Sequence, residues 1–91
     1  MLRLDAYDIA DPRRLRRVAR TCLDYGVRIE KSVFECRLDE RDFKSFIWEL
    51  GRIIDGEEDS VVCYPVCAAC EAEIAVLGCV ARGREQELLV F

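Results

Sequence analysis

Histidine is absent from this 91-residue chain, and so is any long run of apolar residues. Without histidine, the chain lacks the side chain that most often acts as a general base near neutral pH. The apolar stretches are only a few residues long, which excludes a membrane-spanning helix and gives no sign of a secretory signal. The sequence therefore predicts a cytoplasmic protein with no membrane contact.

An excess of positive charge is also lacking, because 18 acidic residues outnumber 14 basic ones and the formal net charge is −4. Such a chain does not wrap nucleic acid with its whole surface, so any contact with a polyanion must be local. Apolar residues at 52% and charged residues at 35% describe a folded globular protein. A single domain of this size buries only about 60–65% of its unfolded surface, which favours assembly with another chain.

An apolar strand begins the chain and ends at a carboxylate. Leu2, Leu4 and Ala6 alternate with polar or aromatic residues, the period of two that is typical of a half-buried strand. This alternation predicts that Asp8 shares the inward phase and lies where the strand ends. A carboxylate in this place can hold a metal beside a phosphate backbone, or it can serve only as a turn or capping residue.

A helix that carries a cluster of arginines follows at once. Asp11 is a suitable N-cap and Pro12 a suitable first residue, which predicts a helix from about Pro12 to Tyr25 with Gly26 ending it. The apolar residues of one face are Leu15, Val18, Ala19 and Cys22, and the arginines are Arg13, Arg14, Arg16, Arg17 and Arg20. All of these arginines except Arg14 cluster opposite the apolar face. Their like charges repel one another, and an external anion bound there would reduce this repulsion. The sequence predicts a nucleic-acid contact at the arginines, with a solvated basic face as the alternative.

The order of the remaining elements predicts an α+β fold of the ferredoxin-like type. Two short strands, 27–30 and 33–38, meet at a turn, and a second helix begins after Asp39. A strand at 60–65 follows an acidic loop, and 73–77 is expected to form another short strand. This βαββαβ order makes an antiparallel sheet with both helices on one face, and we predict that the domain covers residues 1–78.

Residues 79–91 are predicted to form a C-terminal tail. Its last part, Leu88 to Phe91, is apolar and is expected to make an additional strand for assembly. We predict that this strand docks on the dimer partner or on another subunit, because strand addition satisfies its backbone. A tail that pairs only with its own sheet is the alternative.

Six cysteines indicate a different class of function, a structural zinc site. Four of them lie close together in the sequence, and two have the spacing that lets both thiolates bind one metal. The four are Cys63, Cys67, Cys70 and Cys79. Only one such pair is present, so the sequence favours free thiols over zinc. Cys22 and Cys36 fit core positions as small apolar residues, and disulfides are not expected in a reducing compartment.

The motifs and their order resemble one known family. They are Tyr7-Asp8-Ile9, the basic helix, the segment from Lys31 to Cys36, the acidic loop from Asp55 to Ser60, and Tyr64-Pro65 before Cys67. Together, across residues 2–78, they are similar to the Cas2 family, the small CRISPR-associated protein of the spacer-acquisition complex. The resemblance implies a ferredoxin-like homodimer in which two copies of Asp8 face each other across the two-fold axis. It also implies a role in CRISPR adaptation, in which the dimer binds DNA or RNA and bridges integrase subunits.

The resemblance also implies roles for individual residues. Asp8 matches the family's magnesium-binding aspartate, and Arg17 matches a helix arginine that is linked to nuclease activity. Ser32 and Phe34 match the Ser-Val-Phe motif beside the proposed catalytic site. Some members are metal-dependent endonucleases on RNA or DNA, so Mg²⁺ or another divalent cation is the expected cofactor. The chain offers no general base, because Asp11 already has a capping role.

A plain protein-interaction domain is the remaining alternative, since ferredoxin-like folds host many functions. The arginines in register on one helix face argue against a plain protein-interaction domain, because binding only protein partners does not require such a cluster of positive charge. We therefore rank nucleic-acid binding and bridging above hydrolysis.

Overall fold

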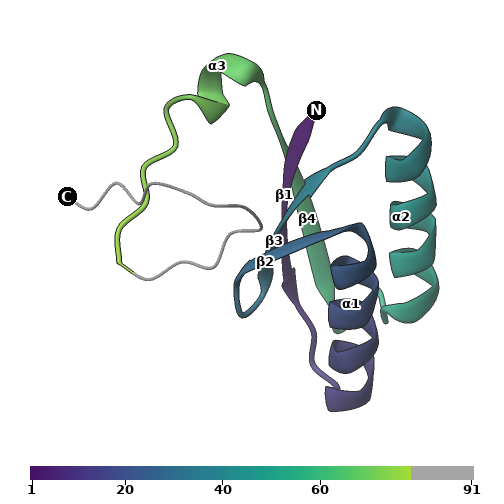
Figure 1. The fold of residues 1–91 in the computed structure, drawn as a ribbon. Coiled ribbons are helices and arrows are strands. Elements are labelled where there is room, and N and C mark those ends of the chain that lie inside the picture. Colours follow the sequence, from purple (N-terminus) through teal and green to yellow (C-terminus); the bar gives the residue numbers. More distant parts are fainter. Residues whose placement is uncertain (79–91) are drawn as a thin grey trace.

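Two helices cover one face of a four-stranded antiparallel sheet, as Figure 1 shows. The computed structural model describes residues 1–78. The strands are β1 (Leu2–Asp8), β2 (Gly26–Glu30), β3 (Val33–Arg37) and β4 (Ser60–Val66), and the helices are α1 (Pro12–Tyr25), α2 (Glu40–Ile53) and α3 (Ala68–Glu71). The strands lie in the order β2-β3-β1-β4. The predicted α+β fold of ferredoxin-like type is confirmed, with α1 and α2 on the same face of the sheet.

The chain after β4 differs from the prediction, because 73–77 forms no strand. The single turn of α3 comes first, and it continues through hydrogen bonds from Glu73 N–H to Cys70 O (3.0 Å) and from Ile74 N–H to Glu71 O (3.2 Å). Backbone donors that close a helical turn are not available to a strand ladder. The predicted tail, with its strand from Leu88 to Phe91, lies outside the described residues, and the division at residue 78 stays a prediction.

Leu2 is buried, as the sequence predicts, but further along β1 the two faces are the reverse of the prediction. Tyr7 and Asp5 are buried on the helix side, whereas Asp8, on the opposite phase, is exposed. Two polar groups of the buried phase have partners, because the Cys36 thiol donates to Asp5 Oδ2 (2.7 Å) and the Tyr7 hydroxyl donates to Lys31 O (3.2 Å). The other carboxylate oxygen, Asp5 Oδ1, is buried without a hydrogen-bond partner among residues 1–78. Polar side chains with such partners can occupy a core face. Strand alternation then sends the apolar residues of β1 to the other face.

The core lies between the sheet and the two long helices. Phe34 of β3, Phe46 of α2 and Val18 of α1 have no exposed surface. Cys22 and Cys36 are also fully buried, which confirms the core positions predicted for them. Their role is to fill space between α1 and β3, as small apolar side chains do.

The packing face of α1 is rotated relative to the predicted one. Val18 and Thr21 are buried, but Leu15 is 39% exposed. Arg14, one turn before Val18, lies toward the packing side, where its side chain is only 24% exposed.

None of the helices in residues 1–78 is long and apolar enough to cross a membrane.

The second long helix, α2, follows the sequence pattern closely. Asp39 is its N-cap and accepts a hydrogen bond from Asp42 N–H (2.8 Å), as predicted. Phe46 and Leu50 are buried, and Trp48, which lies off the apolar stripe, is 62% exposed. Local capping and helical periodicity are therefore enough to place this element.

Gly26 joins α1 to β2 at a point where the backbone passes very close to β3. Its φ is −160°, which is extended backbone that any residue can adopt. A Cβ at this position would lie 2.4 Å from Glu35 O and 2.7 Å from Cys36 Sγ. Glycine is required here by the close approach rather than by its backbone conformation.

The face of the sheet opposite α1 and α2 carries exposed apolar side chains. In the pairing of β1 with β4, Leu4 lies opposite Tyr64, and Ala6 lies opposite Val62. Val62 is 44% exposed and Tyr64 is 55% exposed. We call Leu4, Ala6, Asp8, Val62 and Tyr64 the open face. Neighbouring exposed apolar side chains of this kind are typical of a protein interface.

Candidate metal and nucleic-acid site

Asp8 is the last residue of β1 and lies beside the ends of other elements. It is opposite Ser60 of β4, and the residue before it, Tyr7, donates its N–H to Ser32 O (3.0 Å) in the turn between β2 and β3. Its side chain is exposed and forms no ion pair among residues 1–78. The predicted position at the strand end is confirmed, but the predicted inward phase is wrong. The carboxylate belongs to the open face, where a ligand or a second copy can reach it.

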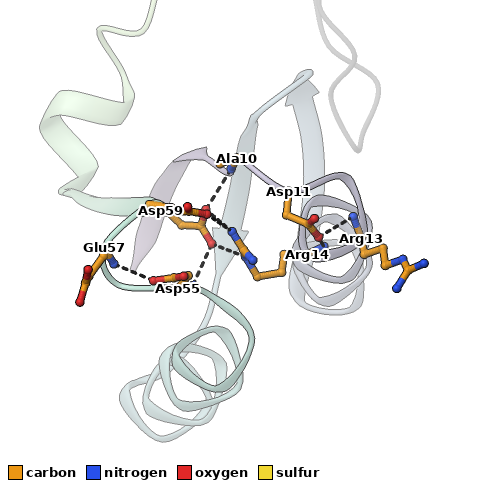
Figure 2. Close-up of polar contacts among 8 residues, drawn as sticks. Ala10, Asp11, Arg13, Arg14, Asp55, Glu57 and Asp59 are labelled. Carbon is orange, nitrogen blue, oxygen red and sulfur yellow. Dashed lines mark hydrogen bonds and ion pairs between the residues drawn. The ribbon is translucent and has the colours of Figure 1, made fainter.

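Asp59 holds the segment that follows Asp8, as Figure 2 shows. Its side chain has no exposed surface and accepts hydrogen bonds from Ala10 N–H (2.9 Å), Asp55 N–H (2.8 Å) and the Arg14 guanidinium (2.8 Å from Nε). These donors, Arg14 above all, hold the pKa of Asp59 well below its usual range. The contacts join the end of β1, the first turn of α1 and the acidic loop. We call them the Asp59 latch.

The latch was not predicted, because the sequence shows only an acidic loop at this place. A local signal was present in Asp55, whose Oδ1 accepts from Glu57 N–H (2.9 Å) in a tight turn that contains Gly56. The partner of Asp59 is Arg14, which lies 45 residues earlier in the chain. Turn propensity therefore predicts a compact loop but not the ion pair that fastens it.

Asp11 caps α1, as predicted. Its Oδ2 accepts hydrogen bonds from Arg14 N–H and Arg13 N–H, both at 3.0 Å. These bonds, with the one from Arg14 having the largest effect, lower the pKa of Asp11. A carboxylate that is used in this way is not free to be a second metal ligand or a general base.

The arginines of α1 divide into two groups. One surface hollow of about 320 Å³ is lined by Arg13, Arg16, Arg17 and Arg20. None of these four forms an ion pair with another residue of the 1–78 segment. Arg14 instead pairs with Asp59 and with Glu58 (3.0 Å), so the prediction that it faces a polyanion with the others is wrong. Four neighbouring guanidinium groups that form no ion pair in the described part of the chain attract an external anion.

The other residues of the predicted catalytic set differ in exposure and in what they contact. Phe34 is fully buried and stacks on Tyr7 with ring centroids 6.0 Å apart, so it positions the strand end by packing and does not reach a substrate. Ser32 is half-buried and contacts Tyr7 through its carbonyl. Arg17 lies in the arginine hollow, and no ion pair within residues 1–78 joins it to Asp8. One chain therefore does not bring these groups together into a closed catalytic centre.

The fold and the order of these features match a known family. The family model described as CRISPR associated protein Cas2 matches residues 1–74. The chain belongs to the Cas2 family. A Rhodospirillum rubrum protein named CRISPR-associated endoribonuclease Cas2 4 is 41% identical over 73 residues, which cover 79% of this chain and 58% of that protein. A Halalkalibacterium halodurans protein named CRISPR-associated endonuclease Cas2 is 42% identical over 69 residues, which cover 70% of this chain and 72% of that protein.

Solved structures show the same architecture. A hypothetical protein from Thermus thermophilus superposes with a TM-score of 0.80 at 36% identity, covering 88% of this chain and 93% of that one. Streptococcus pyogenes Cas2 superposes with a TM-score of 0.77 at 36% identity, covering 86% of this chain and 100% of that one. The resemblance to Cas2 that the sequence motifs indicated is thereby confirmed.

The nuclease names of these Cas2 relatives lead to a test of whether the site fits a divalent cation. Within residues 1–78, no group of three or more cysteine, aspartate or glutamate side chains is placed to hold a metal ion. Asp11 and Asp59 are already occupied by backbone and arginine donors, which leaves Asp8 at the strand end. Mg²⁺ needs only one or two protein carboxylates besides water and phosphate oxygens. The described residues of one Cas2 chain thus offer the Asp8 carboxylate as a ligand that such a cation could use.

In the described part of this Cas2 chain, the cysteines that the zinc alternative invokes form no group of three that could hold a metal ion, although Cys67 and Cys70 contact each other. Cys67 and Cys70 are exposed at α3, whereas Cys63 is half-buried on β4. Burial and a hydrogen bond with Asp5 raise the pKa of Cys63 to about 12, while the Cys70 backbone N–H lowers the pKa of Cys67. Cys79 lies outside the described residues, so the four-cysteine site stays a prediction.

The Asp59 latch leads us to predict how the stability of the fold depends on pH. Asp59→Asn should lower the melting temperature at pH 7 by about 5–10 °C, because an amide NH₂ would face donors and Arg14 would lose its buried partner. Since the pKa of folded Asp59 lies below its usual 3.8, the latch is complete above about pH 4 and is lost as the pH falls further. Thermal unfolding from pH 7 to pH 2 should show a steeper acid loss for the parent than for Asp59→Asn.

Glu58→Gln is the matched control for this experiment. Glu58 also pairs with Arg14, but its side chain is 60% exposed. Exposed ion pairs contribute little, so its melting temperature should change by less than about 2 °C. Equal losses in the two variants would contradict the latch.

Proposed function

We propose that this Cas2 family member is a homodimeric nucleic-acid-binding subunit that bridges integrase subunits during CRISPR spacer acquisition. The observation that carries the proposal is the arginine hollow on α1, lined by Arg13, Arg16, Arg17 and Arg20. A nucleic-acid backbone neutralises such a group of guanidinium ions and gains affinity by releasing its counterions. This function requires a cytoplasmic location, where the nucleic acid is.

The open face supports the dimer. Packing two sheets face to face would remove Val62 and Tyr64, both now well exposed, from water. Asp8 lies on the same face, and a two-fold axis through that face places equivalent residues of the two copies near each other. The arginine hollow lies on the helix side of the sheet, so both copies keep it accessible in such a dimer.

A second candidate function is metal-dependent cleavage of RNA or DNA, and the exposed Asp8 favours it. The endonuclease and endoribonuclease names of the relatives support the same candidate. The Asp8 carboxylates of two copies would hold Mg²⁺ or another divalent cation. Such a cation, when bound, polarises a phosphodiester and lowers the pKa of a bound water. Arg17 would bind substrate phosphates, while Ser32 and Phe34 would keep the end of β1 in place.

Nucleic-acid binding is tested by replacing the four arginines of the hollow with glutamine. The variant should bind duplex DNA at least about 100-fold more weakly at 0.1 M salt, because phosphate contacts dominate affinity. The slope of log K against log salt concentration should fall by about 0.9 for each phosphate that the variant no longer binds. Fluorescence anisotropy with a labelled duplex across a salt series measures both quantities.

Arg41→Gln provides the control, because Arg41 is an exposed arginine of α2 that does not line the hollow. Arg41→Gln should change neither the DNA affinity nor the salt slope.

The bridging role is measured by mixing the parent with the purified integrase subunit, which should give a complex that contains two copies of this chain. Unchanged DNA affinity and slope in the four-arginine variant would overturn the proposal and favour a plain protein-interaction domain.

A further inference from the structure

Two exposed cysteines contact each other at α3, the single helical turn that follows β4. Cys67 is the residue directly before this turn and Cys70 is the third residue in it. Both are exposed free thiols, and their side chains lie in contact. Figure 1 shows α3 standing apart from α1 and α2, so the pair is a separate feature from the arginine hollow.

Contacts within α3 and with the sheet hold the two cysteines in this arrangement. Glu71 N–H donates to Cys67 O (2.8 Å), which closes the turn. The Glu71 carboxylate, next to Cys70 in the chain, accepts hydrogen bonds from both terminal nitrogens of Arg37 in β3. A bidentate arginine–carboxylate pair fixes the orientation of its partners. The turn that carries the thiols is thereby attached to the sheet.

The two thiols differ in acidity. The Cys70 backbone N–H, followed by the Cys70 thiol, lowers the pKa of Cys67 below its usual range. The contact with Cys67 raises the pKa of Cys70 in turn. The thiolate is the attacking form of a cysteine, so Cys67 is suited to be the nucleophile while Cys70 retains its proton.

The other cysteines of residues 1–78 lack this combination of exposure and acidity. Cys22 and Cys36 are fully buried, and burial raises the pKa of Cys22 to about 12. Cys63 is half-buried, and its pKa is also raised to about 12. Buried thiols in apolar surroundings are inert, whereas exposed thiols of lowered pKa react. Among the described residues, reactivity is therefore concentrated at Cys67 and Cys70.

We propose that Cys67 and Cys70 are a reversible dithiol–disulfide pair that reacts with small-molecule disulfides of the glutathione class. The Cys67 thiolate attacks one sulfur of the oxidant, which forms a mixed disulfide and releases one small thiolate. Cys70 then loses its proton to solvent and attacks Cys67 Sγ, which expels the second small thiolate. The pair gives up two electrons and two protons, and the oxidant becomes two small thiols. An excess of small thiol reverses both steps, so a reducing compartment keeps the pair as free thiols.

The test treats the reduced parent with oxidised glutathione at neutral pH. The parent should lose two free thiols and the mass of two hydrogen atoms, and peptide mapping should place the bond between Cys67 and Cys70. Cys70→Ser should stop at the mixed disulfide and gain the mass of one bound glutathione. Cys67→Ser should react at least about tenfold more slowly, because the remaining thiol of the pair is the less acidic one. Both side chains are exposed, so both variants should fold as the parent does.

A pH profile and a comparison with the unfolded chain separate a built pair from two ordinary surface cysteines. Iodoacetamide should label Cys67 before Cys70, with a midpoint below the pH at which a free cysteine titrates. The equilibrium constant for disulfide formation should be about tenfold larger for the folded parent than in concentrated urea, because the fold holds the thiols in contact. Cys79→Ser is the control, and it should react as the parent does.

Several results would overturn the inference. The parent could keep both thiols free in an excess of oxidised glutathione, or the bond could join Cys79 to one of them. Equal equilibrium constants in the folded chain and in urea would show that the fold does not build the pair. Tight zinc binding by the reduced parent that is lost in both Cys67→Ser and Cys79→Ser would assign the pair to a zinc site instead. The four-arginine variant keeps every cysteine, so nucleic-acid binding and this inference are tested independently.

Discussion

Asp8→Asn is expected to lower metal-dependent cleavage of RNA or DNA by at least about 100-fold, because the substitution removes the proposed metal ligand from both copies of a dimer. The fold should be retained. The Asp8 side chain is exposed and forms no ion pair among residues 1–78, so the melting temperature should change by less than about 2 °C. Cleavage of labelled single-stranded RNA and duplex DNA in Mg²⁺ measures the activity. Isothermal titration with Mg²⁺ measures the metal affinity independently of cleavage.

Asp24→Asn is the matched control for this substitution. Asp24 is an exposed carboxylate of α1, away from the end of β1. Its replacement should leave cleavage and Mg²⁺ binding at the level of the parent. The assignment of Asp8 is wrong if Asp8→Asn cleaves and binds Mg²⁺ as the parent does.

Negative charges on the open face are expected to separate the dimer. Val62→Asp combined with Tyr64→Asp places two carboxylates where the sheets would meet, and burying a charge without a partner is costly. The dissociation constant of the dimer should rise by at least about 100-fold. Light scattering at micromolar concentration should give the 10.5 kDa mass of one chain, whereas the parent should give twice that mass.

The same variant tests whether Asp8 acts as a pair. Asp8 is unchanged in it, so a loss of Mg²⁺ binding together with the dimer would mean that both copies supply the carboxylate. Leu23→Asp is the control, since Leu23 is 55% exposed on α1 and not on the open face. It should remain dimeric. A monomeric parent, or a double variant that stays dimeric, would contradict an interface on the open face.

The Asp59 latch and the arginine hollow use different arginines of α1. The latch fixes the first turn of α1 and the segment after Asp8. Arg14 binds Asp59 in the latch and does not line the arginine hollow. The other four arginines of α1 form no ion pair within residues 1–78. We therefore expect fold stability and the proposed nucleic-acid affinity to depend on different arginines of the same helix, so that single substitutions separate them.

The sequence by itself determined the order of the elements from β1 to β4, both helix N-caps and the cluster of arginines on α1. These features rest on contacts within a few residues or on helical periodicity. Asp11 and Asp39 each cap the residues that directly follow them, in α1 and α2. An i,i+3 or i,i+4 pattern places side chains on one helix face whatever the rest of the fold is. Local physics of this kind can be read from the order of residues.

Only the tertiary structure decided which face of β1 is buried and which arginine of α1 is neutralised. Both depend on partners far away in the sequence, since Cys36 lies 31 residues from Asp5 and Asp59 lies 45 residues from Arg14. An alternating strand has two faces, and periodicity does not say which one is inward when the polar phase can be hydrogen-bonded in the core. The hollow between the two long helices has the same origin, because Arg20 and Arg52 border it only once α1 packs against α2.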